Sequence, residues 1–224
     1  MWDPQAAAFS SRFRVLRCDT RGHGRSSATP GPYSIEQLAR DVLALLDAVH
    51  IDRVRFCGLS MGGQIGQWLG IHAPDRLDKL ILCNTGAKIG TEESWKTRID
   101  TVRSKGLAEV APAVLARWFT LAYREKDPGT VAEILRIMEA VNPEGYIACC
   151  AAVRDFDSRS SLARIRTPTL VIAGTHDAST PPAEGRYLAE RIPGARYAEL
   201  NAAHLSNIED REAFNRELNN FLAS

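Results

Sequence analysis

A serine flanked by glycines in Gly58-Leu59-Ser60-Met61-Gly62 is the clearest chemical signal in the sequence. The stretch reads G-x-S-x-G, follows a short apolar run at 54–57 and precedes a helical pattern. A serine between a strand and a helix is typical of a nucleophile elbow, a strained turn that needs small neighbours. The turn exposes the hydroxyl and lets the next amide point at a developing oxyanion. We therefore expect Ser60 to be a nucleophile and Met61 to donate to the oxyanion.

A serine hydroxyl is a weak nucleophile at neutral pH, so it needs a base, and the base needs a group that orients it. Asp177 follows the apolar run 169–173, and His204 follows the run 196–200. Taken alone, Asp177 is equally compatible with capping a turn. Its place after a strand and ahead of His204 favours catalysis, because both loops then lie at the sheet edge that carries the elbow. The sequence predicts a triad of Ser60, His204 and Asp177.

The elements that would position these residues alternate between strands and helices. We expect strands at 13–18, 54–57, 77–83, 169–173 and 196–200, and helices at 34–49, 61–72, 182–191 and 211–222. This alternation favours an α/β fold with a mostly parallel sheet flanked by helices.

A long stretch in the middle of the chain lacks strand candidates. Residues 91–156 show only helical periodicity, broken at 106, 127–129 and 142–143, which predicts an inserted cap of about four helices. The expected organisation is core α/β structure over 1–88, a helical cap over 89–160 and core α/β structure over 161–224.

Composition limits the partners. The 224 residues are enough for one domain with a full core, and 45% hydrophobic and 25% charged residues are ordinary for a soluble protein. The 28 Lys and Arg against 27 Asp and Glu give a net charge of +1, which favours neither nucleic acid nor an anionic membrane as partner. No apolar run is long enough to span a bilayer. We expect a small-molecule substrate, and the sequence leaves the oligomeric state open.

Five cysteines bear on the compartment and on metal binding. They are Cys18, Cys57, Cys83, Cys149 and Cys150. Their spacing matches no zinc site, and an odd number in apolar surroundings favours reduced thiols. The first nine residues also lack the basic and apolar regions of a secretory signal. We expect a cytoplasmic protein with no metal and no cofactor.

These motifs resemble the α/β-hydrolase superfamily, and in particular the 3-oxoadipate enol-lactonases of aromatic-compound breakdown. The matching residues are D-T-R-G-H-G at 19–24, C-G-L-S-M-G-G at 57–63, C-N-T at 83–85, R-W-F-T at 117–120, G-T-H-D at 174–177 and A-H-L-S-N-I-E at 203–209. The triad motifs are common to the superfamily, whereas R-W-F-T and H-x-S-N-I-E are more particular to the lactonases. The resemblance implies a serine hydrolase that opens 3-oxoadipate enol-lactone to 3-oxoadipate in protocatechuate and catechol degradation.

The resemblance also implies a difference at the front of the chain. Family members carry further residues ahead of the region that Met1 matches, and these hold the first strands and a loop with the second oxyanion amide. The chain is therefore expected to lack those strands, with Met61 as its identifiable donor. A lost donor costs about a hundred- to a thousandfold in turnover. Two alternatives stay open: a broad carboxylesterase of the same fold, and a truncated fragment with impaired catalysis or a binding role.

The expected substrate bears a carboxylate, so the cap should offer a cation. Trp95 and Arg98 are three residues apart and share a face of the first cap helix. We expect Arg98 to bind the carboxylate, with Trp95 as a wall of the pocket and Trp118 as a second wall. A solvated arginine beside a core tryptophan is the alternative interpretation.

Overall fold

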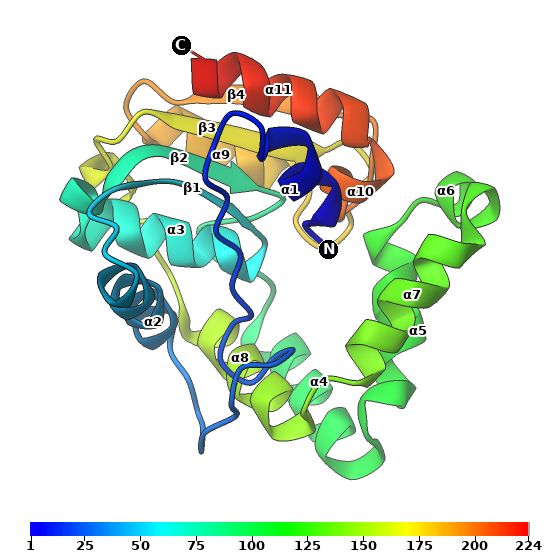
Figure 1. Cartoon of the computed structure of the whole chain (residues 1–224). Coiled ribbons are helices and arrows are strands. Elements are labelled where there is room, and N and C mark those ends of the chain that lie inside the picture. The colour runs from blue at the N-terminus through cyan, green and yellow to red at the C-terminus, as the bar shows by residue number, and fades with distance from the viewer. Residues whose placement is uncertain (224) are drawn as a thin grey trace.

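A computed structural model describes residues 1–223 as one sheet with helices on both faces and a block of helices inserted between its second and third strands (Figure 1). The elements are α1 (Asp3–Phe9), α2 (Ile35–Ala48), β1 (Val54–Leu59), α3 (Met61–His72), β2 (Leu77–Cys83), α4 (Glu92–Lys105), α5 (Leu107–Trp118), α6 (Leu121–Lys126), α7 (Pro128–Glu139), α8 (Pro143–Asp155), β3 (Thr169–Gly174), α9 (Pro182–Arg191), β4 (Arg196–Leu200), α10 (Ser206–Glu209) and α11 (Arg211–Ala223). Short 3-10 turns lie at Pro74–Arg76 and Leu162–Arg164. Across residues 1–223, no helix is both long enough and apolar enough to cross a membrane.

The sheet is parallel, as the alternation of elements predicts. Within the described residues it has four strands in the order β1-β2-β3-β4. The last residues of β1 and β2, Leu59 and Cys83, are paired, and so are the last residues of β3 and β4, Gly174 and Leu200. All four strands therefore end at the same edge of the sheet. The loops that leave this edge begin with Ser60, with Asn84 and with the segments that carry Asp177 and His204. The parallel sheet therefore brings together segments that are far apart in the sequence.

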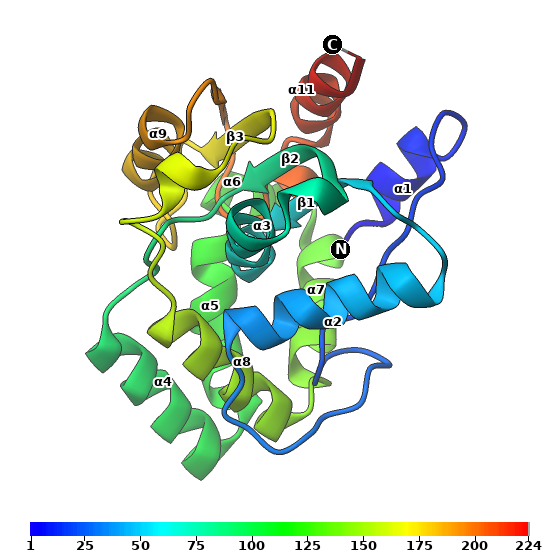
Figure 2. The same cartoon turned by 90° about the vertical axis from the view of Figure 1, so that its left-hand side faces the viewer.

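Alternate residues of each buried strand supply two hydrophobic layers. Along β2, Leu80 and Leu82 face a core shared with α2, α3 and α9. Ile81 and Cys83 face a second core, shared with α1 and α11. Figure 2 shows the two sets of helices on opposite sides of the strands. Such two-sided burial explains the unbroken apolar runs at 80–83 in β2 and at 170–173 in β3.

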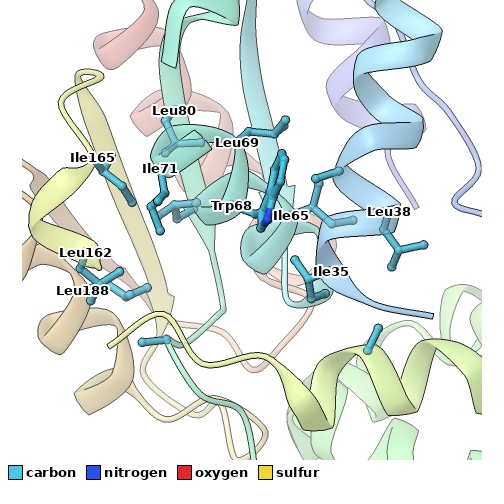
Figure 3. Close-up of a cluster of buried hydrophobic side chains, with 14 of the residues drawn as sticks. Ile35, Leu38, Ile65, Trp68, Leu69, Ile71, Leu80, Leu162, Ile165 and Leu188 are labelled. Atoms are coloured by element: carbon cyan, nitrogen blue, oxygen red, sulfur yellow. The ribbon is translucent and has the colours of Figure 1, made fainter. Parts of the chain in front are cut away.

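Helix α3 packs closely against the sheet. Figure 3 shows Ile65, Trp68 and Leu69 of this helix between Leu38 of α2 and Leu80 of β2. Each fully buried side chain of this size contributes about 1.5–3 kcal/mol relative to an exposed one. This packing fixes the start of α3, and hence the position of Ser60.

The inserted block holds five helices in this part of the chain, α4 to α8, so the expectation of about four is wrong by one. The additional break follows Trp118. Phe119 is extended, and the Thr120 side chain accepts a hydrogen bond from the Tyr123 amide at 3.1 Å, which begins α6 as a new helix. A threonine within an amphipathic pattern does not by itself indicate that a helix ends, because it caps a helix only where the backbone around it is extended.

The expectation of a strand at 13–18 is wrong, because the structure has irregular backbone there. A strand needs a neighbour for its backbone amides and carbonyls, and no segment among residues 1–223 pairs with this one. The segment passes β1 at Phe13, whose ring lies 5.1 Å from the Arg55 guanidinium. Val15 and Leu16 beyond it are 41% and 45% exposed. The apolar pattern of a strand is present, but the pairing that would make it one is not.

Candidate active site

Ser60 lies at the sharp turn between β1 and α3. Its φ of 57° and ψ of −115° form a combination that is strained for any residue with a side chain. A Cβ on Gly58 would lie 2.1 Å from the Gly62 carbonyl oxygen, and one on Gly63 would lie 2.5 Å from the Thr85 side chain. Only glycine fits at both positions, and their small size permits the close approach of β1, α3 and the next loop. This is the geometry of a nucleophile elbow.

Hydrogen bonds from the neighbouring strand fix the elbow. The Ser60 amide donates to the Cys83 carbonyl at 2.9 Å, and the Thr85 hydroxyl donates to the Ser60 carbonyl at 2.7 Å. Met61 is the first residue of α3, where amides have no acceptor within the helix and the helix dipole is positive. An oxyanion formed beside Ser60 would find such an amide available, and the role of Met61 stays a prediction.

His204 and Asp177 meet from two different loops. His204 Nδ1 lies 2.8 Å from Asp177 Oδ2, and each residue is 3% exposed. Asp177 follows β3 and His204 follows β4, so the two parallel strands bring them to the same edge. A histidine bound to a carboxylate through Nδ1 keeps Nε2 for proton exchange with a hydroxyl.

The Asp177 carboxylate is held in its charged form by several donors. Its Oδ1 accepts from the amides of Ser179 and Thr180 at 2.8 and 2.9 Å, and its Oδ2 accepts from the Thr180 hydroxyl at 2.8 Å. Burial alone would raise the pKa of Asp177. The hydrogen bonds and charge of His204, with further bonds from Thr180 and Asn84, outweigh burial and hold the pKa below its usual value. Asp177 is therefore ionised at neutral pH and can stabilise an imidazolium.

Asn84, the residue after β2, connects this acid to the histidine loop. Its Nδ2 donates to Asp177 Oδ2 at 3.0 Å and to the Ala203 carbonyl at 3.1 Å. Its Oδ1 accepts from the Ser206 hydroxyl at 2.6 Å. Asn84 is 1% exposed, and its φ of 43° is one that asparagine tolerates better than most residues. Both amide hydrogens and the oxygen are satisfied, so the Asn84 side chain has one fixed orientation.

The structure does not join Ser60 to His204 by a hydrogen bond within residues 1–223, although both lie at the same edge of the sheet. Catalytic hydrogen bonds in ligand-free enzymes are often long and shorten once substrate is bound. The arrangement thus consists of a formed Asp177–His204 pair and a serine presented beside it on the elbow.

The cap reaches this pair through Trp118 at the end of α5. The Trp118 and His204 rings are stacked, with centroids 6.1 Å apart and an angle of 26° between their planes. The Leu205 amide donates to the Trp118 carbonyl at 3.1 Å, which fixes the end of α5 against the histidine loop. Of the three cap residues expected at the site, Trp118 is the one that the structure places directly on His204.

Trp95 and Arg98 lie together on α4, and among residues 1–223 neither forms a hydrogen bond or ring contact with Asp177 or His204. The Arg98 guanidinium lies 4.7 Å from the centre of the Trp95 ring, a cation–π contact. Trp95 donates its Nε1 hydrogen to the Ile89 carbonyl at 2.6 Å. Burial raises the pKa of Tyr146 to about 12, and the charge of the nearby Arg98 acts in the opposite direction. Arg98 forms no ion pair among the residues described, so its charge has no protein counter-ion. An unpaired, half-buried guanidinium of this kind suits an anionic ligand.

Arg117 is a second cation between the cap and the core. Its guanidinium is partly desolvated although the residue is exposed as a whole. This desolvation and the nearby Arg98 charge lower the pKa of Arg117, while Tyr146 and Asp177 act in the opposite direction. Arg117 lines a cavity of about 490 Å³ whose walls include Thr120 from the cap and His176 from the loop of Asp177. The sequence analysis assigned Arg117 no role of its own and used it only as part of the R-W-F-T motif.

Known proteins with similar sequences have the fold that the sheet and the elbow indicate. Residues 1–211 match the family model described as the alpha/beta hydrolase fold. The chain belongs to the α/β-hydrolase family. The elbow, the parallel sheet and the inserted helices are thus the elements of an α/β-hydrolase.

Several relatives of this α/β-hydrolase carry the same functional name. It is 45% identical over 215 residues to 3-oxoadipate enol-lactonase 2 of Acinetobacter baylyi, covering 96% of this chain and 80% of the relative. It is 37% identical to 3-oxoadipate enol-lactonase 1 of the same organism, covering 100% and 84%. The solved structure of the enol-lactonase from Burkholderia xenovorans LB400 is 49% identical, with a TM-score of 0.98, and the match covers 100% of this chain and 86% of that one.

Asn84 is a candidate site residue of this α/β-hydrolase to which the sequence analysis assigned no role. The C-N-T motif supports the family resemblance, but neither periodicity nor spacing assigns the asparagine a contact. One signal was available: Asn84 directly follows a strand whose carboxyl end lies at the same edge as Ser60 and Asp177. A polar residue at that position of a parallel sheet is a candidate site residue.

Replacement of Asn84 by alanine is expected to lower kcat by about 10- to 100-fold, since loss of a hydrogen bond to a charged group costs about 1.5–3 kcal/mol. Asp177 would lose one donor, and the Ala203 carbonyl would lose its partner. Steady-state kinetics with an ester substrate measure the change, and thermal unfolding checks that the variant is folded. Asn220→Ala, at an exposed position of α11, is the control and should behave as wild type. A folded Asn84→Ala enzyme with unchanged kcat would show that the contact has no catalytic value.

Proposed function

We propose that this chain is a serine hydrolase that opens 3-oxoadipate enol-lactone to 3-oxoadipate. The observation that carries the proposal is the buried Asp177–His204 pair at the sheet edge where the elbow presents Ser60. The named function of the relatives at 45% and 37% identity supplies the substrate. All five cysteines are free thiols, which fits the reducing cytoplasm as the place of action.

In the first step, the Ser60 oxygen bonds to the lactone carbonyl carbon while His204 takes the hydroxyl proton. The carbonyl oxygen becomes an oxyanion beside the Met61 amide. The bond from this carbon to the ring oxygen then breaks, and the ring oxygen leaves as an enolate. His204 returns its proton to the leaving group, and the resulting enol becomes a ketone. An enolate leaves more readily than a simple alkoxide, which reduces the stabilisation that the oxyanion requires.

In the second step, water hydrolyses the acyl-enzyme. His204 takes a proton from water as the water oxygen bonds to the acyl carbon, and the same proton returns to the Ser60 oxygen when its bond breaks. The products are 3-oxoadipate and the restored serine. Asp177 keeps the histidine in the tautomer that has Nε2 free, and stabilises the imidazolium in both steps.

In this proposal the helical cap recognises the substrate. We divide the chain into core structure over 1–88, a cap over 89–160 and core structure over 161–224. Arg98 binds the substrate carboxylate, and Trp95 and Trp118 wall the pocket. Support for this assignment comes from the unpaired Arg98 charge beside Trp95 and from the stacking of Trp118 on His204.

Replacement of Arg98 by alanine is expected to raise KM for the anionic lactone by about 10- to 100-fold, because a hydrogen bond to a charged group is worth about 1.5–3 kcal/mol. KM for a neutral ester such as p-nitrophenyl acetate should be unchanged. Arg103→Ala is the control, because Arg103 lies exposed on the same helix and pairs with Asp100. Equal effects of Arg98→Ala on the anionic and neutral substrates would count against the assignment.

The function itself is tested by comparing substrates with the wild-type enzyme. For a lactonase of this specificity, we expect kcat/KM for the enol-lactone to exceed that for a neutral ester of similar size by at least about tenfold, the value of one modest polar contact. Equal values for both substrates would favour a broad carboxylesterase. An enzyme that hydrolyses neither would contradict the proposal.

A further inference from the structure

The carboxylate of Glu209 joins two segments that are far apart in the sequence. Its Oε2 accepts from the Ala203 amide at 3.0 Å, and both of its oxygens lie 3.3 Å from the Thr120 amide. Its Oε1 also accepts a short hydrogen bond from the Thr120 hydroxyl. Ala203 directly precedes His204, and Thr120 begins α6 in the cap. One side chain therefore connects the histidine loop to the cap.

Two further contacts make this junction continuous. The Leu205 amide donates to the Trp118 carbonyl at 3.1 Å, on the other side of His204. Phe119 and Leu205 are 1% and 3% exposed and belong to one small apolar cluster with Ile134 of α7. The Leu205 amide is thus bonded directly to the cap, and the Ala203 amide is connected to the cap through Glu209.

We propose that Glu209 is a positioning residue that couples the seating of the cap to the placement of His204. The inference rests on the proposed serine-hydrolase function, because it assigns His204 the role of general base. Glu209 touches no reacting atom. It acts through the Ala203 backbone, which Asn84 also holds from the carbonyl side. When Thr120 and Glu209 are bonded, the cap and the loop of His204 are fixed relative to one another.

The chemistry of the junction requires a carboxylate. The Ala203 amide, the Thr120 amide and the Thr120 hydroxyl all donate to Glu209, and an ionised carboxylate is acceptor-only with room for several hydrogen bonds. Glutamine has nearly the same shape, but one of its two terminal atoms is a donor. Its amide nitrogen would either oppose a backbone N–H group or donate to the Thr120 hydroxyl oxygen, and in both cases residue 209 would lose a hydrogen bond that it now accepts. Glu209→Gln is therefore a sharp change to the hydrogen bonding with little change in volume.

The rate at which a fluorophosphonate labels Ser60 tests the proposal without reference to the lactone. We expect Glu209→Gln to lower the maximal labelling rate at least tenfold, with little change in the probe concentration that gives half the maximal rate. Glu212→Gln makes the same change at an exposed position of α11 and should label as wild type. A merely structural Glu209 would lower the melting temperature and leave the labelling rate of the folded enzyme unchanged, which would overturn the proposal.

A second pair of variants tests the junction from the cap. Thr120→Val removes the hydroxyl that donates to Glu209, and Thr120→Ser restores it. We expect slower labelling in the valine variant and recovery in the serine variant. Equal rates in the two variants would overturn the coupling. A wild type that labels at Ser60 but does not hydrolyse the lactone would refute the proposed substrate alone, and the comparison of labelling rates would still decide the role of Glu209.

Discussion

Replacement of Ser60 by alanine is expected to lower kcat for every ester substrate by about a millionfold, the loss seen when a triad serine is removed from a serine hydrolase. The hydroxyl that forms the acyl-enzyme would be absent, and no neighbouring side chain on the elbow offers another nucleophile. Alanine is smaller than serine and leaves the packing of α3 against the sheet intact, so the variant should fold. Hydrolysis of the enol-lactone, followed spectrophotometrically, measures the effect.

The matched control for this change is Ser160→Ala. Ser160 is exposed in the segment between α8 and β3, and the same substitution there should leave kcat unchanged. A Ser60→Ala enzyme that retains kcat within about tenfold of wild type would be incompatible with covalent catalysis at this residue.

The second large effect is expected from Asp177→Asn, which should lower kcat by about ten-thousandfold. Asparagine keeps the size of the side chain and its bonds from the Ser179 and Thr180 amides. Its amide group can, however, donate to His204 Nδ1, which places the imidazole proton on Nε2, where it cannot accept the serine proton. The loss of negative charge also removes the stabilisation of the imidazolium.

Steady-state kinetics at several pH values measure this effect, with Asp75→Asn as control. Asp75 is exposed in the turn Pro74–Arg76 and forms no ion pair among the described residues. A fall in kcat of less than about tenfold in Asp177→Asn would show that the buried carboxylate does not orient the base.

The sheet edge could be predicted from sequence because each strand there is a short segment with several apolar residues that leads into a loop. Asp177 and His204 follow such segments, and Ser60 lies in a motif whose glycines allow neighbouring elements to approach closely. Parallel strands end at one edge, so the positions of these residues in the elements were sufficient to bring them near one another. The contact between Asp177 and His204 is the direct outcome of that arrangement.

The features that sequence did not predict depend on partners distant in the chain. The run 13–18 has the pattern of a strand, but no segment in the described part of the chain pairs with it. Thr120 caps the start of α6, and Glu209 and the Tyr123 amide bind it there. The orientation of the Asn84 side chain depends on its hydrogen bonds with Asp177, Ala203 and Ser206. A pattern within a short window does not contain such contacts, since they are set by the three-dimensional packing.

The most direct test of the whole account is to treat the folded wild-type enzyme with a fluorophosphonate and map the adduct by peptide mass spectrometry. We expect one adduct, on Ser60, and we expect His204→Ala to prevent its formation on the same timescale. Both results follow if the imidazole activates this hydroxyl. A folded wild-type enzyme with no adduct, or with its adduct on a different residue, would contradict the claim that Ser60, His204 and Asp177 form the catalytic centre.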